Sequence, residues 1–244
     1  MREIRCFVPM PLLAGSVVEL PELAAGHLVR VLRLGPGARV TLFNGDGFDY
    51  AAQIEEARKQ RCSVRVGEAK ANLTESPLHS VLLQGVARGE KMDLILQKAC
   101  ELGVSEIWPV ITERTEVRLD GERAERRHAH WLGVLRGAAE QSGRASVPQL
   151  APLRPLADAL AQLPAGERLL LAPDAPHPLS TLPLGADTAV QLLIGPEGGL
   201  GERDVQIAAA AGFTAARLGP RILRTETAGL VALAVLQMRW GDLG

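Results

Sequence analysis

Along the first 70 residues, short apolar runs alternate with polar residues and end at turn-forming residues. This pattern is typical of β-strands, which bury every second side chain. Only residues 22–32 repeat apolar side chains at helical spacing. The pattern therefore predicts a small β-barrel with one helix. Its strands are expected at 17–20, 38–43, 48–54 and 62–66, with an Asn-Gly-Asp-Gly turn at 44–47.

After the polar stretch 70–77, which lacks periodicity, strand and helix patterns alternate to the end of the chain. Such alternation predicts an α/β domain with a parallel sheet. We place the domain boundary so that the two domains are 1–72 and 73–244. Because knots are rare, the pattern alone favours an unknotted doubly wound fold. The expected strands are 79–86, 107–111, 169–172 and 190–194, and the expected helices are 90–102, 122–141, 204–211 and 226–240.

The composition excludes several classes of protein. The longest apolar stretch, 228–236, is less than half of the ~20 residues that span a bilayer, and the N-terminus has no apolar signal core. The three cysteines are far apart and form no CxxC pair, so neither a disulfide framework nor a zinc site is expected. These features favour a cytoplasmic protein.

The charge balance bears on nucleic-acid binding. The formal net charge is −1, which argues against a strongly basic binder, and aromatic residues make up only 3%, which argues against base stacking on an aromatic platform. Only four of the 27 basic residues are lysines. That bias suits bidentate phosphate contacts by arginine, or it reflects codon usage.

Two polar segments near the C-terminus carry the candidate chemistry. Gly195-Pro196-Glu197-Gly198-Gly199 follows an apolar run at once, and glycines after a buried strand allow a ligand to approach the backbone. The segment 218–228 places Arg224, Thr225 and Glu226 just before an apolar helix, where polar donors gather. The two segments predict a pocket for a polar small molecule. The alternatives are a tight connection with Glu197 in solvent and a helix cap at Thr225.

Common nucleotide and metal motifs are missing from the sequence. It contains no GxGxxG, GxxxxGK[ST] or HExxH run. A standard dinucleotide fold, a P-loop NTPase and a metalloprotease are therefore not expected.

The two C-terminal segments, taken with four others, resemble the SPOUT class of S-adenosyl-L-methionine-dependent RNA methyltransferases. More narrowly, the chain resembles the family that methylates uridine N3 in 16S ribosomal RNA. The resemblance implies an N-terminal PUA-like RNA-binding β-barrel and a C-terminal SPOUT domain with a trefoil knot. The four other segments are 27–33 (HLVRVLR), 43–45 (FNG), 101–104 (ELGV) and 140–144 (EQSGR).

The resemblance implies a site for S-adenosyl-L-methionine formed mainly by main-chain groups, with no metal. Glu197 would either accept a hydrogen bond from a ribose hydroxyl or lie near the sulfonium. The implied cofactor-binding residues are Leu171, Gly195, Pro196, Glu197, Gly198, Leu218, Gly219, Ile222, Leu223, Arg224, Glu226 and Thr227.

Methylation of N3 requires loss of its proton. Arg224 and Arg136 are the candidate cations for the charge that develops on the uracil oxygens, and Glu226 or Glu140 could accept the proton. Arg136, Glu140 and Arg144 share one face if the helix continues past Gly143, and that face is either a solvated charged face or a contact to RNA. The candidate RNA-binding residues are Arg2, Arg5, Arg30, Arg33, Lys91, Lys98 and Arg144.

The expected partners are 16S rRNA, within the 30S subunit, and a second copy of the chain in a homodimer. Two other functions remain open. One is a SPOUT enzyme of another specificity, such as ribose 2′-O methylation, and the other is a non-catalytic RNA-binding assembly factor.

Overall fold

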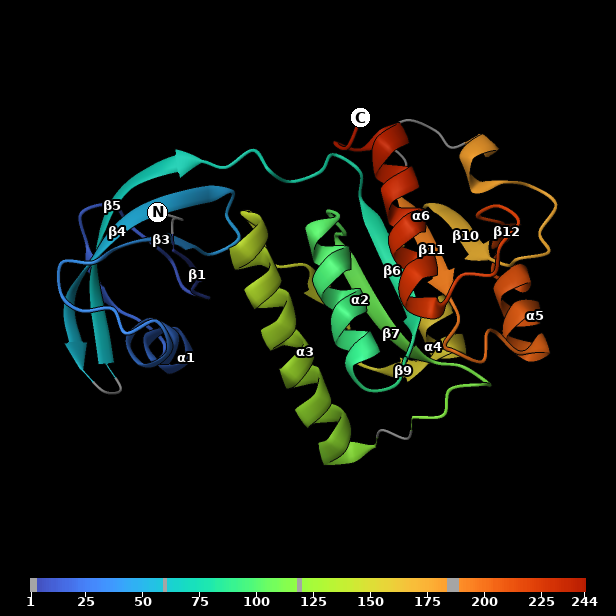
Figure 1. Ribbon diagram of the computed structural model, residues 1–244, viewed down its shortest axis with the longest axis horizontal. Helices are drawn as coiled ribbons and strands as arrows, with labels where there is room; N and C mark the ends of the chain where they lie inside the picture. The colour runs from blue at the N-terminus through green and yellow to red at the C-terminus, as the bar shows by residue number, and fades with distance from the viewer. Residues whose placement is uncertain (1–3, 59–60, 118–119, 184–188) are drawn as a thin grey trace. The chain divides into compact units, whose positions relative to one another are not determined.

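The computed structural model describes residues 4–58, 61–117, 120–183 and 189–244 (Figure 1). The chain forms two compact units. Unit 1 comprises Met1–Glu75 and Ala139–Val147, and unit 2 comprises Ser76–Ala138 and Pro148–Gly244. The change of unit after residue 75 lies three residues beyond our boundary. The sequence pattern did not indicate that 139–147 would join unit 1.

Unit 1 is built on a five-stranded sheet in the order β1-β3-β4-β5-β2. The β1–β3 pair is parallel, whereas the other pairs are antiparallel. The four predicted strands are present, and the fifth strand, β1, which was not predicted, is formed by its parallel pairing with β3. The strands are β1 Arg5–Phe7, β2 Val17–Glu19, β3 Arg39–Phe43, β4 Phe48–Arg58 and β5 Arg61–Ala71.

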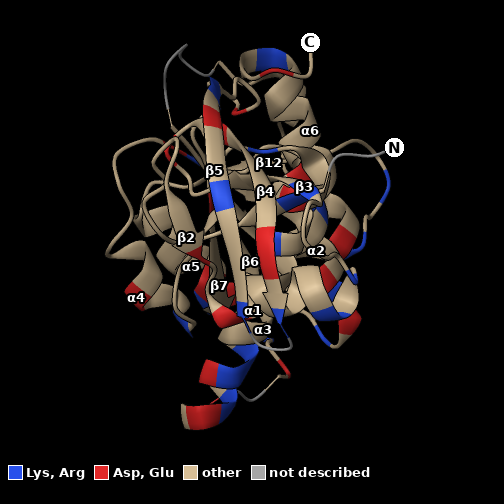
Figure 2. Ribbon diagram, turned by 90° about the vertical axis from the view of Figure 1, so that its left-hand side faces the viewer, with Lys and Arg blue, Asp and Glu red and all other residues tan. Residues whose placement is uncertain are grey.

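The predicted helix of unit 1 is present in two parts, α1 Glu22–Gly26 and the π-helical η1 His27–Val31. Ala24, Ala25 and Leu28 pack into the same core as the apolar side chains of the strands. The edge strands β1 and β2 have no ladder with each other in the described part, so the predicted barrel is open. Acidic and basic positions are interspersed along β4 and β5, as Figure 2 shows, and Arg65 pairs with Glu55.

Residues 139–147 are held in unit 1 by a buried polar network. The Arg144 guanidinium donates to the Glu75 carboxylate at 2.6 Å, and Arg5 Nη2 donates to the Arg144 carbonyl at 2.8 Å. The Phe7 N–H donates to Glu140 at 2.9 Å. Burial acts to raise the pKa of Glu75, but hydrogen bonding and charge attraction from Arg144 outweigh it and lower that pKa. These contacts explain why the segment belongs to the first unit.

Unit 2 contains a sheet in the order β12-β10-β11-β6-β7-β8, with all of its pairs parallel. The α/β class with a parallel sheet is therefore confirmed, whereas the trefoil knot stays a prediction. The strands are β6 Ser80–Gly85, β7 Glu106–Ile111, β8 Gln149–Leu150, β9 Arg154–Pro155, β10 Glu167–Leu171, β11 Val190–Ile194 and β12 Thr214–Ala216.

Helices cover both faces of this sheet. Successive residues of a strand point to opposite sides, and the central strands β6 and β11 are buried at every position, so both faces need cover. Val81, Leu83 and Leu193 share one core with residues of α4 and α5. On the other face Leu82 and Ile194 lie near Gly229 of α6, and α6 packs beside α2 (Figure 1). The helices are α2 Glu90–Glu101, α3 Gly121–Ser142, α4 Leu156–Leu160, the 3₁₀ turn η2 Leu179–Thr181, α5 Glu202–Ala210 and α6 Thr225–Trp240.

The strand register gathers the carboxyl ends of the parallel strands at one edge. Ile194 of β11 lies opposite Gln84 of β6, and Gly85 lies opposite Val110 of β7. The loops that leave these strands therefore meet at that edge, where open α/β sheets bind their ligands. No helix in the described part of the chain is long and apolar enough to cross a membrane.

Candidate functional site

The two polar segments near the C-terminus are joined by a relay of hydrogen bonds through β6. Gln84 is fully buried, and its Nε2 donates to Thr225 Oγ1 at 3.0 Å. Thr225 Oγ1 in turn donates to the Gly195 carbonyl at 2.6 Å. The end of β6, the loop after β11 and the start of α6 are thereby held together, although Gly195 and Thr225 are 30 residues apart.

Two glycines allow these segments to pack closely. A Cβ at Gly195 would lie 2.7 Å from the Gly199 carbonyl carbon, and one at Gly85 would lie 2.6 Å from the Pro196 nitrogen. Both distances are shorter than real Cβ contacts, so any larger residue would displace the backbone. The glycines at 85 and 195 therefore let the β11 loop fold back on itself and on β6.

Two further glycines adopt conformations that other residues avoid. Gly199 and Gly219 have φ values of 71° and 95°, in the left-handed region. Nothing lies within 4 Å of the place where either Cβ would be. Each of these loops therefore presents bare backbone toward open space, as a ligand that binds main-chain groups requires. Gly198 differs, because its Cβ position is 3.1 Å from Arg114, whose Nη1 donates to the Gly198 carbonyl.

Three charged side chains converge beside the loops. Lys91 Nζ lies 3.2 Å from Glu197 Oε1 and 3.8 Å from Glu226 Oε2. Glu197 also accepts the backbone N–H of Arg88 at 3.1 Å. Burial acts to raise the pKa of Glu197, but hydrogen bonds from its own N–H and that of Arg88, together with the Lys91 ammonium, hold the pKa below its usual value. Glu197 is therefore a carboxylate at neutral pH.

A second polar link joins the loop after β7 to the start of α5. The buried Asp204 carboxylate accepts the backbone N–H of Gly201 at 2.9 Å and that of Glu113 at 3.1 Å. Sequence reasoning missed Gln84, Arg88, Arg114 and Asp204. Gln84 did carry a signal, since it is a polar amide that directly follows the apolar run Val81-Leu82-Leu83 of its strand.

The remaining predicted cofactor residues lie at the same edge. Leu171 ends β10 and is half-buried, as are Leu218, Gly219 and Leu223. Pro196 is buried, whereas Thr227 and Arg224 are exposed at the start of α6. Ile222 is 84% exposed, so its side chain points away from the unit. Only its main-chain groups could bind a cofactor in this unit.

The predicted RNA-binding residues have several different environments. Lys91 belongs to the charged cluster beside the loops, and Lys98 pairs with Glu101 at 2.8 Å. Arg30 is exposed, with its guanidinium over Gly26, and Arg33 is exposed with a φ of 57°. Arg2 lies outside the described residues.

Arg5 and Arg144 require a correction. Their side chains are 10% and 7% exposed and are paired with Asp49 and Glu75. A guanidinium that is buried and paired within its own unit is not placed to contact phosphate, so both arginines have a structural role. Glu140, a candidate base, accepts the Phe7 N–H in unit 1, and Arg136 is half-buried on α3.

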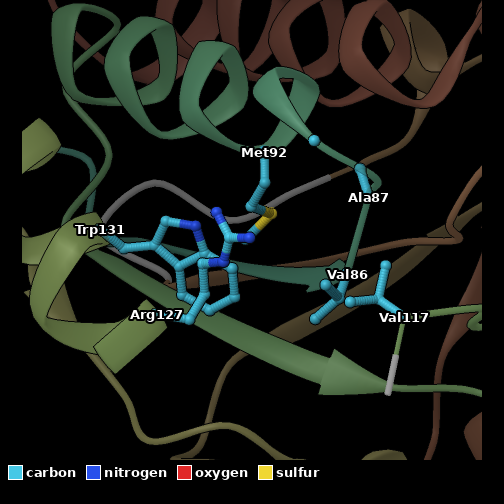
Figure 3. Close-up of a pocket in the computed structure, with 7 residues that line it drawn as sticks. Val86, Ala87, Met92, Val117, Arg127 and Trp131 are labelled. Carbon is cyan, nitrogen blue, oxygen red and sulfur yellow. The ribbon is translucent and has the colours of Figure 1, made fainter. Parts of the chain in front are cut away.

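A small cavity lies between the segment that joins β6 to α2 and the side chains of Arg127 and Trp131 on α3 (Figure 3). Its volume is about 20 Å³, which is room for one water molecule but not for a base. Met92 and Arg127 point toward the Trp131 ring in Figure 3, and Trp131 Nε1 is buried without a hydrogen-bond partner among the described residues. The lining residues are Val86, Ala87, Gly89, Met92, Val117, Arg127 and Trp131.

Comparison with known proteins defines the class to which this fold and site belong. The family described as RNA methyltransferase domain matches residues 74–237, and the RNA methyltransferase PUA domain matches residues 24–67. The chain is thus an RNA methyltransferase with a PUA domain, as the resemblance implied.

Individual relatives narrow this class. Ribosomal RNA small subunit methyltransferase E of Bacillus subtilis is 30% identical over 220 residues, which cover 86% of this chain and 85% of the relative. The enzyme of that name from Neisseria gonorrhoeae, solved with bound S-adenosyl methionine, is 38% identical with full coverage of both chains and a TM-score of 0.90. A Legionella pneumophila protein solved with the cofactor SAM is also 38% identical, with full coverage and a TM-score of 0.91. The chain belongs to the ribosomal RNA small subunit methyltransferase E family.

Proposed function

We propose that this protein transfers a methyl group from S-adenosyl-L-methionine to N3 of a uridine in 16S rRNA of the small ribosomal subunit. The observation that carries the proposal is the Gln84–Thr225–Gly195 relay, which joins the two cofactor segments at the carboxyl edge of the sheet. Family membership supports the reaction class. The resemblance to uridine-N3 enzymes supports the target atom.

The residues present suit the cofactor. Bare backbone at Gly199 and Gly219 can bind adenine and ribose through main-chain groups, and Glu226 has a buried oxygen without a hydrogen-bond partner among the described residues. When bound, S-adenosyl-L-methionine supplies a methyl carbon attached to a sulfonium, which is already an activated leaving group. The protein therefore has to align the base with the methyl group, accept the N3 proton and stabilise the charge that develops on the base.

Glu226 is our candidate for accepting the N3 proton. It lies in the first turn of α6, within the segment 218–228 that is proposed to hold the cofactor, and its side chain is 14% exposed. Arg224 precedes it by two residues and is exposed, so its guanidinium can reach a base outside the unit. We assign Arg224 to stabilise the negative charge that develops on the uracil oxygens, with Arg136 as the second candidate.

We propose that unit 1 positions the RNA through Arg30 and Arg33, because phosphate contacts of this kind fix register without reading sequence. Lys98 and, outside the described residues, Arg2 are further candidates. The proposed substrate is 16S rRNA within the 30S subunit, the proposed assembly is a homodimer, and the proposed location is the cytoplasm.

The test is a methylation assay on purified 30S subunits and on free 16S rRNA, followed by mass analysis of the nucleosides. We expect 3-methyluridine to appear only when both the protein and S-adenosyl-L-methionine are present. A ribose-methylated nucleoside instead would overturn the N3 specificity. Cofactor binding without any methylation of either substrate would indicate an assembly factor.

A further inference from the structure

We infer that Lys91, Glu197 and Glu226 form a charge-selective cluster that makes the site prefer the cationic cofactor over its neutral product. The inference rests on the proposed function. S-adenosyl-L-methionine carries a positive sulfonium, whereas S-adenosylhomocysteine, which remains after methyl transfer, carries a neutral thioether. The two ligands otherwise differ by one methyl group, so a site can separate them by charge.

The cluster brings two carboxylates from separate loops onto one ammonium. Glu197 comes from the loop after β11, Glu226 from the first turn of α6, and Lys91 from the first turn of α2. Their formal charges sum to −1, since one cation faces two anions. A single positive charge on a ligand would bring the local sum to zero.

The neighbouring arginines leave most of this negative charge in place. The Arg88 guanidinium pairs with Glu116, and only its backbone N–H reaches Glu197. Arg114 donates to the Gly198 carbonyl and is exposed, so water screens its charge.

Glu226 is the under-satisfied member of the cluster. Glu197 Oε1 has both the Arg88 N–H at 3.1 Å and Lys91 Nζ at 3.2 Å. Glu226 Oε2 is buried, and the 3.8 Å to Lys91 is too long for a hydrogen bond. A buried carboxylate oxygen without a donor is costly. A cation bound beside it would remove that cost.

The same charges would make the site hold S-adenosyl-L-methionine more strongly than S-adenosylhomocysteine. In the reaction the N3 lone pair forms a bond to the methyl carbon, the S–CH₃ bond breaks with its electron pair staying on sulfur, and the N3 proton passes to Glu226. The cluster and the cofactor together remain neutral through this step. When Glu226 then releases the proton to solvent, its negative charge faces a neutral thioether, so charge no longer holds the product.

A purely structural role for Glu226 has to be separated from this one. A carboxylate in the first turn of a helix is stabilised by the helix dipole, whatever ligand is bound. If that were its whole role, replacing Glu226 would weaken both ligands equally. The experiment therefore compares ligands of different charge on the same variants.

The experiment is isothermal titration of the full-length protein with S-adenosyl-L-methionine, S-adenosylhomocysteine and sinefungin, an analogue with an amine-bearing carbon in place of the sulfonium. For Glu226→Gln we expect the two cationic ligands to bind about tenfold more weakly, because one attractive unit charge is lost. The affinity for S-adenosylhomocysteine should change by less than about twofold, since a neutral sulfur makes no charge–charge contact.

Lys91→Met provides the opposite change. It makes the cluster more negative, so the preference for the cationic ligands over S-adenosylhomocysteine should rise. Glu101→Gln, which removes a carboxylate from the exposed Lys98–Glu101 pair in the same unit, is the matched control and should leave every affinity unchanged.

Equal losses for all three ligands in Glu226→Gln, or an unchanged preference in both cluster variants, would overturn the inference. Failure of the wild-type protein to bind S-adenosyl-L-methionine would instead refute the proposed function itself. Thermal melting of each variant without ligand shows whether it is folded, and the ratio between two ligands on one variant does not depend on its folded fraction.

Discussion

Arg144 shows how the surroundings of one residue decide its role. In the sequence it follows Glu140 at helical spacing and suits an RNA contact. In the structure its side chain is 7% exposed and forms an ion pair with Glu75, while the Arg5 guanidinium donates a hydrogen bond to its carbonyl. The same residue type at Arg33 is exposed and in a left-handed conformation. Burial and pairing therefore separate a structural arginine from one that can meet phosphate.

The first prediction concerns this buried pair. Arg144→Ala should lower the free energy of unfolding by about 2–3 kcal/mol, somewhat below the usual cost of breaking a buried pair because Glu75 is one-third exposed. Urea denaturation measures the change. The control Arg126→Ala removes an exposed pair with Glu122 and should cost no more than about 0.5 kcal/mol. Equal effects of the two substitutions would contradict the structural role of Arg144.

At the scale of secondary-structure elements, the site depends on how β6, the β11 loop and α6 are joined. The strand patterns placed β6 and β11 correctly along the chain. Their adjacency arises from the parallel pairing of Ile194 with Gln84. The Gln84 amide then bonds the first residue of α6. One buried side chain thus sets the relative position of three elements.

The second prediction tests this relay. Gln84→Met should weaken S-adenosyl-L-methionine binding about tenfold. The substitution removes the hydrogen bond from Gln84 to Thr225, and a loss of about 1.4 kcal/mol in binding free energy is a tenfold change in affinity. Isothermal titration measures the change. The control is Gln191→Met, which replaces another fully buried glutamine in the same sheet, bonded to Arg168 and Pro164 instead of the loops. Its cofactor affinity should stay at the wild-type value even if its stability falls. A Gln84 variant with unchanged affinity would remove the relay from the site.

At the scale of the whole molecule, the chain forms two units, and we propose that one binds RNA and the other the cofactor. The segments predicted to bind the cofactor lie entirely in unit 2, whereas Arg30 and Arg33, which are predicted to bind RNA, lie in unit 1. Each unit has its own sheet and its own core. This separation leads us to expect that RNA affinity and cofactor affinity respond to different substitutions.

The third prediction follows from that division. Arg30→Ala combined with Arg33→Ala should weaken RNA binding and reduce the salt dependence of log K by roughly 1 for each lost phosphate contact. The affinity for S-adenosyl-L-methionine should not change. The matched control is Arg58→Ala with Arg61→Ala, which removes the same charge from unit 1 at residues paired with Glu56 and Glu19. If the two double variants lose RNA affinity equally, the effect is one of net charge and not of a specific surface.

The fourth prediction concerns assembly. Helix α6 is apolar along most of its length, yet Met238 is 65% exposed and Val231 is 37% exposed. An apolar helix with exposed side chains is suited to pack against a second copy. Light scattering at micromolar concentration should give twice the monomer mass of 26.0 kDa. A monomer mass would contradict the proposed homodimer.

The sequence by itself determined the long elements and the order of the domains. Helices α2 and α3 carry enough periodic apolar residues to specify their buried faces, whereas α6 is marked by its nearly continuous apolar run. Strand β3 lies between turn residues, and a glycine-rich turn follows β11. Two segments could also be proposed to bind the cofactor, because glycines after a strand and polar residues before a helix are local signals. The predicted site residues of those segments stay predictions until ligand binding is measured.

Only the tertiary structure decided the rest. The short strands β1, β8, β9 and β12 exist because a neighbouring strand pairs with them, and two or three residues hold no pattern of their own. The transfer of residues 139–147 to unit 1, the place of Lys91 between two carboxylates and the burial of Arg144 all depend on partners distant in sequence. A charged side chain carries the same chemistry in every setting, and its role is decided by which partners the fold brings within a few ångströms and by how much water remains around it.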